Sequence, residues 1–143
     1  MRIETKSLDD FSSRELYEYL KLRSEVFVVE QACIYLDPDG RDDRAWHVLG
    51  YADDGSLLAC TRIFDGGDYM EDPSIGRVAV KASHRGKGLG KAIMEASVRE
   101  AEKRFNPDRI LLSAQTYLKA FYRDLGFREY GDEYLEEIGR AHV

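Results

Sequence analysis

The sequence predicts an α/β fold in which helices flank a central mixed β-sheet. Apolar runs of strand length alternate with stretches of helical periodicity, in the order β-α-β-β-β-α-β-α-β-β. A glycine-rich turn joins one of these strands to the helix that follows it. The chain has 143 residues and shows no repeat, linker or low-complexity segment, so we expect residues 1–143 to form one domain.

The first half of the chain is predicted to supply an edge strand, a helix and a hairpin. Met1–Lys6 is the expected edge strand. Apolar residues at helical spacing predict a helix from Ser13 to about Glu30, whose half-apolar end is compatible with a second short helix. The turn residues at positions 53–55 predict a hairpin with strands at Ala45–Ala52 and Ser56–Phe64.

The second half begins with a strand at Ile75–Val80, before the glycine-rich turn. Apolar and small residues on one face predict a helix at Gly90–Phe105. The elements expected beyond it are a buried strand at Arg109–Gln115, a short helix at Tyr117–Leu125 closed by Gly126, and strands at Phe127–Tyr130 and Glu133–Ile138.

Two acidic loops, Tyr35–Arg44 and Asp65–Pro73, interrupt this pattern. The first could be mistaken for a calcium loop. However, aligning Gly40 with the EF-hand glycine places Tyr35 at the first ligand position and Trp46 where a glutamate is needed. We therefore expect no metal, and interpret this loop as either a solvated turn or an acidic rim of a substrate site.

Composition restricts the possible functions. A net charge of −6 argues against nucleic acid as a partner. No apolar run approaches membrane-spanning length, and the N-terminus lacks the apolar region of a signal peptide. The two cysteines, Cys33 and Cys60, show no metal-ligand spacing and fit free thiols in a reducing compartment. We expect a cytoplasmic protein; a homodimer is compatible with the sequence.

The most informative stretch is Ser83–Lys91, which contains three glycines between a strand and the start of a helix. Helix N-termini bind anions through free N–H groups, and glycines let the backbone approach a phosphate closely. The stretch fits neither the nucleoside-triphosphate P-loop nor the dinucleotide pattern. Five basic residues lie between Pro73 and Met94: Arg77, Lys81, Arg85, Lys87 and Lys91.

Arg85, Gly88 and Gly90 form the pattern Arg-x-x-Gly-x-Gly, which resembles the pyrophosphate loop of the GNAT N-acetyltransferase superfamily. A second segment, Ala120–Phe127, resembles the family's Phe-Tyr-x-x-x-Gly-Phe helix. The order of elements resembles GNAT along the whole chain. Within the superfamily the closest resemblance is to the ElaA-like group, carried by Leu20–Gln31, Tyr35–Asp37, Gly76–Val78, Leu112–Gln115 and Glu133–Glu136. The tail departs from that group, because His142 is followed by one residue only.

The resemblance implies a GNAT-like acyl-CoA N-acyltransferase fold and direct transfer of an acetyl group from acetyl-CoA to a primary amine. The acceptor would be a small molecule, a protein lysine or a protein N-terminus. Backbone N–H groups of Val78 and Val80 would hold the thioester carbonyl. The pyrophosphate would be bound by Arg85, Gly86, Lys87, Gly88, Leu89, Gly90 and Lys91.

Tyr122 matches the family's general acid, since a phenol is protonated at neutral pH and can donate to a leaving thiolate. Phe121 beside it is expected to be a packed core aromatic. The general base is open: Glu30 is the first candidate and His47 the next, whereas His84 is expected to be structural. Two other functions remain open: a non-catalytic acyl-CoA-binding module, and an interaction domain that uses the same fold.

Overall fold

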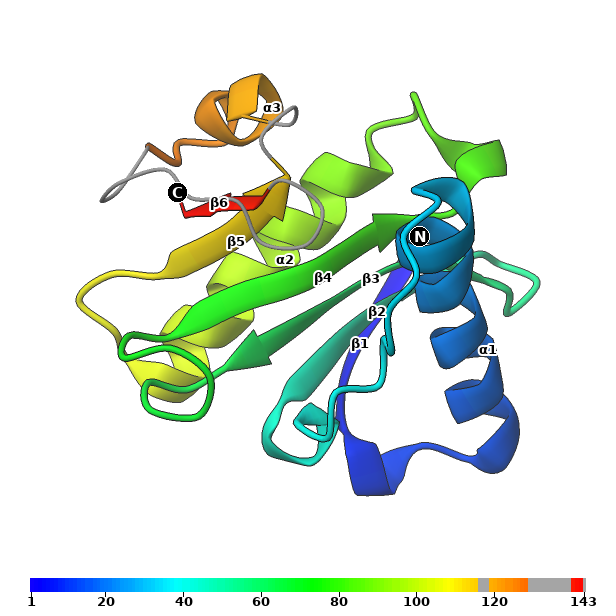
Figure 1. The fold of residues 1–143 in the computed structure, drawn as a ribbon, viewed down its shortest axis with the longest axis horizontal. Helices are drawn as coiled ribbons and strands as arrows, with labels where there is room; N and C mark the ends of the chain where they lie inside the picture. The colour runs from blue at the N-terminus through cyan, green and yellow to red at the C-terminus, as the bar shows by residue number, and fades with distance from the viewer. Residues whose placement is uncertain (116–118, 129–139, 143) are drawn as a thin grey trace.

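The computed structural model describes residues 1–115, 119–128 and 140–142. The described strands form one sheet in the order β1-β2-β3-β4-β5-β6, in which only β4 and β5 are parallel (Figure 1). This confirms the expected mixed sheet. The strands are β1 (Arg2–Ser7), β2 (Trp46–Tyr51), β3 (Leu57–Phe64), β4 (Ser74–Val80), β5 (Leu111–Gln115) and β6 (Arg140–His142). The helices are α1 (Ser13–Ser24), α2 (Leu89–Phe105) and α3 (Lys119–Asp124).

The start of α1 is fixed by a capping box. The Ser12 hydroxyl accepts a hydrogen bond from the Glu15 backbone N–H, and the Glu15 carboxylate accepts one from the Ser12 N–H. Lys6 on β1 also pairs with Glu15, and together these contacts lower the Glu15 pKa to about 2. Beyond Ser24 the chain continues as a π-helical turn, η2 (Glu25–Glu30). The predicted helix therefore reaches Glu30, as expected, but changes its hydrogen-bond pattern on the way.

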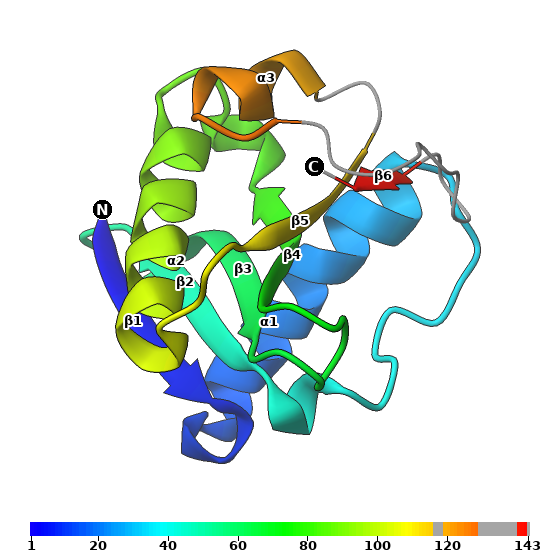
Figure 2. The same ribbon diagram turned by 90° about the vertical axis from the view of Figure 1, so that its left-hand side faces the viewer.

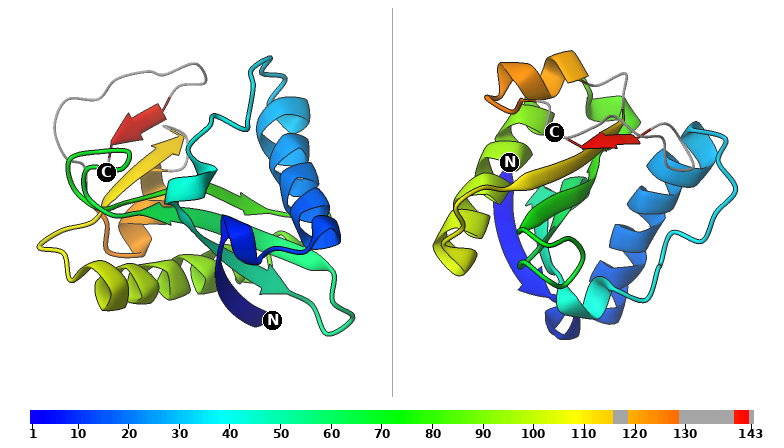
Figure 3. Two further views of the ribbon diagram at one scale, coloured as in Figure 1. Left: turned by 90° about the horizontal axis from the view of Figure 1, so that it is seen from below. Right: turned by 60° about the vertical axis from the view of Figure 1, so that its left-hand side comes forward.

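The two long helices cover opposite faces of the sheet (Figures 2 and 3). The predicted apolar face of α2, including Ile93, Met94 and Ala101, packs on one face against Val48, Ile63 and Leu112. On the other face α1 and η2 pack through Tyr19, Leu22, Val26 and Phe27 against Leu49 and Cys60. All residues of β3 are buried, because this strand lies between two neighbouring strands and under a helix on each side.

Strand β4 contains a bulge at the point where it stops pairing with β5. Cys60 pairs with Ala79 and Arg62 with Gly76, so both Arg77 and Val78 lie opposite one residue, Thr61. Arg77 has a φ of +48°, which is unusual for a residue with a side chain. The parallel pairing of β4 with β5 covers only Ser74 with Leu111 and Ile75 with Leu112. The bulge thus begins directly beyond the last pair.

The C-terminal part differs most from the sequence prediction. Helix α3 runs from Lys119 to Asp124, and Gly126, with a φ of +98°, follows it as the expected cap. The strand expected from Phe127 is wrong for its described half, because Phe127 and Arg128 are not in a strand. The strand expected at Glu133–Ile138 lies outside the described residues. Strand β6 at residues 140–142 was not predicted.

Candidate active site

The glycine loop lies between the end of β4 and the start of α2, where the sequence placed it. Gly86 and Gly88 both have a φ of +79°, a conformation that favours glycine, and open space surrounds the position of a Cβ at each. Gly90 has a different role, since a Cβ there would lie 3.2 Å from the Phe121 ring. Two glycines therefore shape the loop, and the third allows α3 to pack closely on α2.

Helix α2 begins without a side-chain cap. Its N-cap residue is Gly88, whose carbonyl accepts the first helical hydrogen bond from Ala92. The N–H groups of the first turn have no partner within a helix, and the helix dipole adds partial positive charge there. No acidic residue stands in this first turn. The loop and helix end thus form a cradle of backbone donors suited to a phosphate group.

Two of the five basic residues counted around the loop are engaged elsewhere. Arg77 points into a buried ionic network on the α1 face. The Nε of Arg85 donates to the Val80 carbonyl over 3.1 Å, and its two Nη atoms donate to both carboxylate oxygens of Glu30. Of the other three, Lys91 lies 4.0 Å from Glu95 on the same helix. The positive charge expected around the loop is therefore partly paired within the protein.

Glu30, the first candidate for the base, is brought to the glycine loop by the end of η2. Its hydrogen bonds with Arg85 outweigh the effect of partial burial and lower the Glu30 pKa below its ordinary value. The carboxylate is therefore ionised at neutral pH and about two-fifths exposed. This bidentate pair joins two predicted site residues that are 55 positions apart in the chain, which the sequence did not reveal.

The backbone of Val80 faces away from β3. Lys81 donates its N–H to the Leu58 carbonyl on β3, and residues of an antiparallel ladder alternate between facing their partner and facing away. Val80 stands opposite Ala59, next to the bonded pair of Lys81 and Leu58, so its backbone faces away from β3. Its carbonyl accepts a hydrogen bond from the Arg85 Nε instead. Val80 therefore directs its backbone to the side on which β5 lies, beyond the last β4–β5 pair. Val78 stands in the bulge, where this alternation is interrupted.

The aromatic pair on α3 has the reverse burial of what we expected. Tyr122 is 3% exposed and belongs to the core cluster under α2, whereas Phe121 is 36% exposed. The prediction that Phe121 is the core aromatic is therefore wrong. The Phe121 and Tyr122 rings meet edge to face, with centroids 5.0 Å apart, and Phe121 reaches Gly90 of the cradle. Tyr122 as general acid remains a prediction.

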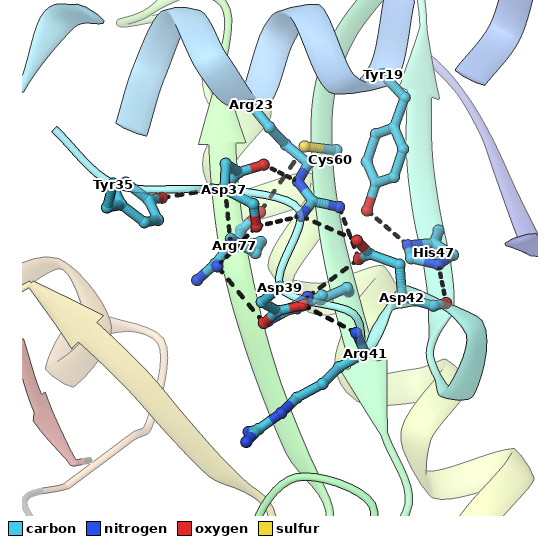
Figure 4. A network of polar contacts seen from close by, with 11 residues as sticks. Tyr19, Arg23, Tyr35, Asp37, Asp39, Arg41, Asp42, His47, Cys60 and Arg77 are labelled. Atoms are coloured by element: carbon cyan, nitrogen blue, oxygen red, sulfur yellow. Dashed lines mark hydrogen bonds and ion pairs between the residues drawn. The ribbon is translucent and has the colours of Figure 1, made fainter. Parts of the chain in front are cut away.

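The acidic loop at residues 35–44 is not a solvated turn. Asp37 and Asp42 are buried, and with Asp39 they pair with three arginines from three different elements (Figure 4). Arg23 of α1 donates to Asp37 over 2.8 Å and to Asp42 over 2.8 Å. The remaining cations of the network are Arg62 of β3 and Arg77 of β4. Three negative charges thus meet three positive ones, with Asp37 and Asp42 buried and Asp39 at the exposed edge of the network.

His47 belongs to the same network and does not suit the role of a base. Its Nε2 donates to the Asp42 carbonyl over 2.9 Å, so in the neutral ring Nδ1 accepts from the Tyr19 hydroxyl over 2.6 Å. Burial is the main cause that lowers the His47 pKa below its ordinary value. The imidazole is fully buried with both nitrogens engaged (Figure 4), which overturns our second candidate for the base.

The sequence contained two signals for this network. The segments that resemble the ElaA-like group include Arg23, Asp37 and Arg77, and Asp37 pairs with both of these arginines. Arg62 gave a second signal that went unused, because it stands in a strand buried on both faces. A charged residue in such a strand needs a buried partner.

Other features of the described residues restrict the chemistry of the site. Both cysteines are free, and burial raises the pKa of the Cys60 thiol to about 12. In the described ranges no cluster of three or more His, Cys, Asp or Glu side chains could hold a metal ion. The helices in those ranges are all too short or too polar to cross a bilayer.

Known proteins resemble the chain over nearly its whole length. The model of the acetyltransferase (GNAT) domain family matches residues 10–142. A UPF0039 protein of Synechocystis is 38% identical over 135 residues, which cover 94% of this chain and 87% of that protein. The protein ElaA of Escherichia coli is 37% identical over 137 residues, covering 94% of this chain and 88% of ElaA.

Solved structures show the same likeness. The crystal structure of an acyl-CoA N-acyltransferase from Pseudomonas aeruginosa aligns with a TM-score of 0.88 and 37% identity, covering 99% of this chain and 96% of that one. The crystal structure of Escherichia coli ElaA aligns with a TM-score of 0.87 and 34% identity, covering 99% and 97%. Fold, glycine cradle and comparisons agree: the chain belongs to the GNAT acetyltransferase family, as a relative of the ElaA group with the fold of an acyl-CoA N-acyltransferase.

Proposed function

We propose that this protein is an N-acetyltransferase that uses acetyl-CoA and acetylates a primary amine by direct attack. The observation that supports it best is the cradle formed by Gly86, Gly88 and the uncapped start of α2. The cradle follows the end of β4, and the pairing of β4 with β5 stops earlier, at Ile75. An extended cosubstrate bound by its pyrophosphate at the cradle would run back along β4 toward the place where that pairing stops. Acetyl-CoA supplies the activated acetyl group and a thiol leaving group.

The chain's own residues would hold the cosubstrate through backbone donors. The loop from Arg85 to Lys91 would bind the pyrophosphate, and Lys87 and Lys91 would add positive charge from its exposed side. Arg85 is already held in place by Val80 and Glu30. The N–H groups of Val78 and Val80 would donate to the thioester carbonyl as negative charge develops on its oxygen.

Two side chains would move protons. Tyr122 would donate its phenolic proton to the departing thiolate, since burial against Phe121 and Phe127 keeps its ring in one orientation. Glu30 would take the proton of the amine through water. Its lowered pKa makes it a weak base, but it keeps the carboxylate ionised at neutral pH.

The charges of the protein bear on the class of acceptor. The aspartates at positions 37, 39 and 42 are paired with arginines, so they do not form the acidic rim of a substrate site that was one of the two interpretations of this loop. The net charge of −6 still favours a cationic over an anionic acceptor over long range. We therefore propose a primary amine of a small molecule, a protein lysine or a protein N-terminus.

Thiol release from acetyl-CoA tests this function, measured with a panel of polyamines, amino acids, lysine peptides and N-terminal peptides. We expect amine-dependent release of thiol, together with a rise in melting temperature with acetyl-CoA that NAD and ATP do not match. A clear thermal shift without release for any amine would favour a non-catalytic acyl-CoA-binding module. Equal shifts with all three ligands would indicate non-specific anion binding and contradict the proposal.

A further inference from the structure

Arg77 occupies an unfavourable place in β4, and the surrounding network compensates for it. Its φ of +48° falls in the left-handed region, which disfavours residues that carry a Cβ. Such a conformation persists only where neighbouring contacts hold it. The side chain is 8% exposed and therefore sits among protein atoms rather than in water. The bulge thus depends on what Arg77 touches.

Asp37 is the main partner of Arg77 and ties it to α1. One carboxylate oxygen of Asp37 lies 2.9 Å from the Arg77 Nε, and the Asp37 carbonyl accepts from the Arg77 Nη2 over 3.2 Å. The other carboxylate oxygen accepts from the Nε of Arg23 over 2.8 Å. The guanidinium of Arg77 also lies over the Tyr35 ring, whose hydroxyl donates to Asp37 (Figure 4). The bulge is therefore clamped to a helix on the other side of the loop.

The clamp acts on the backbone that the proposed reaction needs. Val78 follows Arg77 directly, and the extra residue in the bulge shifts β4 just beyond its last pair with β5. We propose that Asp37 and Arg77 are positioning residues, which fix the bulge so that the N–H groups of Val78 and Val80 are aimed at the thioester carbonyl. This inference rests on the proposed function, and it assigns no contact between either residue and the substrates.

Asp42 provides a matched control within the same network. Like Asp37, it accepts from Arg23 over 2.8 Å, pairs with a second arginine, Arg62, over 3.0 Å, and accepts a hydrogen bond at its carbonyl. The contacts of its carboxylate do not include Arg77. Asp37→Asn and Asp42→Asn therefore remove a similar buried charge, but only the first loosens the bulge.

The experiment compares these two variants in single-turnover acetyl transfer, with acetyl-CoA affinity measured by calorimetry. We expect Asp37→Asn to slow transfer at least about tenfold while acetyl-CoA affinity stays within about threefold, and Asp42→Asn to keep the rate within about threefold. Equal slowing by the two variants at equal loss of thermal stability would overturn the inference, because the effect would then be general destabilisation.

Arg77→Lys serves as a second variant if Asp37→Asn does not fold. Lysine keeps the charge but cannot reach the carboxylate and the carbonyl of Asp37 together. We expect the same loss of rate, and no further loss in the double variant with Asp37→Asn, because both changes break one clamp. Additive losses would contradict this.

Hydrogen exchange gives a reading that does not require activity. The Ala79 amide, which follows the bulge and stands opposite Cys60 in the β3–β4 ladder, should exchange faster in Asp37→Asn and Arg77→Lys than in the wild type, and Asp42→Asn should leave it unchanged. If the wild type transfers acetyl to no amine, the proposed function fails while exchange still tests the clamp. Unchanged exchange in the first two variants would refute the clamp itself.

Discussion

The substitution Gly88→Glu gives the sharpest test of the phosphate cradle. Gly88 has a φ of +79° and no atom within 4 Å of a Cβ, so the Cβ of the new side chain meets no clash. The cost to folding is then the left-handed backbone alone, about 1–2 kcal/mol. A carboxylate about 5 Å from a phosphate charge, at an effective dielectric constant of about 20, costs roughly 3 kcal/mol of binding. We therefore expect acetyl-CoA affinity to fall at least ~100-fold, or ~2.7 kcal/mol.

Gly55→Glu is the matched control for this change. Gly55, in the hairpin turn between β2 and β3, has a φ of +87° and open space around it. The same substitution there should cost the same backbone strain and leave acetyl-CoA binding unaltered. Calorimetry on both folded variants checks this, with melting temperatures to compare their stabilities. If Gly88→Glu binds acetyl-CoA like the wild type, or if Gly55→Glu weakens binding as much, the cradle is not where the pyrophosphate binds.

Three further predictions follow from the site. Tyr122→Phe should slow single-turnover transfer by ~10²–10⁴-fold with acetyl-CoA affinity within about threefold, and an unchanged rate would make Tyr122 only a packed aromatic. Glu30→Gln should lower kcat while acetyl-CoA affinity is kept or rises, since Arg85 loses a charged partner; an unchanged kcat would exclude Glu30 as the base. In the folded protein the pKa of His47 lies below its ordinary 6.5. Between this lowered pKa and 6.5 the unfolded chain binds a proton on His47 that the folded chain does not bind, so the free energy of unfolding falls as pH falls. Urea unfolding from pH 6.5 to 5 should show a slope of up to ~1.4 kcal/mol per pH unit, which His47→Gln removes and His84→Gln keeps.

The buried network has a clear thermodynamic role besides the one proposed for catalysis. Burial raises the pKa of Asp42, but the hydrogen bond and charge of Arg23 outweigh it and lower the pKa below the ordinary value. Removing one member of such a network leaves the others charged and unpaired in a water-excluding interior, which typically costs about 3–5 kcal/mol. Asp37→Asn and Asp42→Asn are therefore both expected to lower the stability of the fold, and only a difference in rate between them reports on the bulge.

The sequence determined the parts of this protein that depend on local signals. Strands β1 to β5 and helix α2 follow from the periodicity of apolar residues, and the hairpin turn from Asp53 to Gly55 follows from turn chemistry. The glycine loop could be placed from sequence because a left-handed backbone and a helix start are encoded by residues next to each other. The end of the first helix at Glu30 was also predicted, but its π-helical hydrogen-bond pattern was not.

Tertiary structure decided which charges meet. Arg77 and Asp37 are 40 positions apart and Glu30 and Arg85 are 55 apart, and no local pattern states that such residues are neighbours. Only the register of β3 and β4, together with the packing of α1, pairs the aspartates of this loop with arginines and buries Asp37 and Asp42. The sequence also did not determine which aromatic residue of α3 is buried. A helix of six residues has too few turns for the periodicity of apolar residues to distinguish Phe121 from Tyr122. Local chemistry thus determined the elements and the cradle, whereas long-range packing determined the partners of Arg85, Glu30, Arg77 and Asp37.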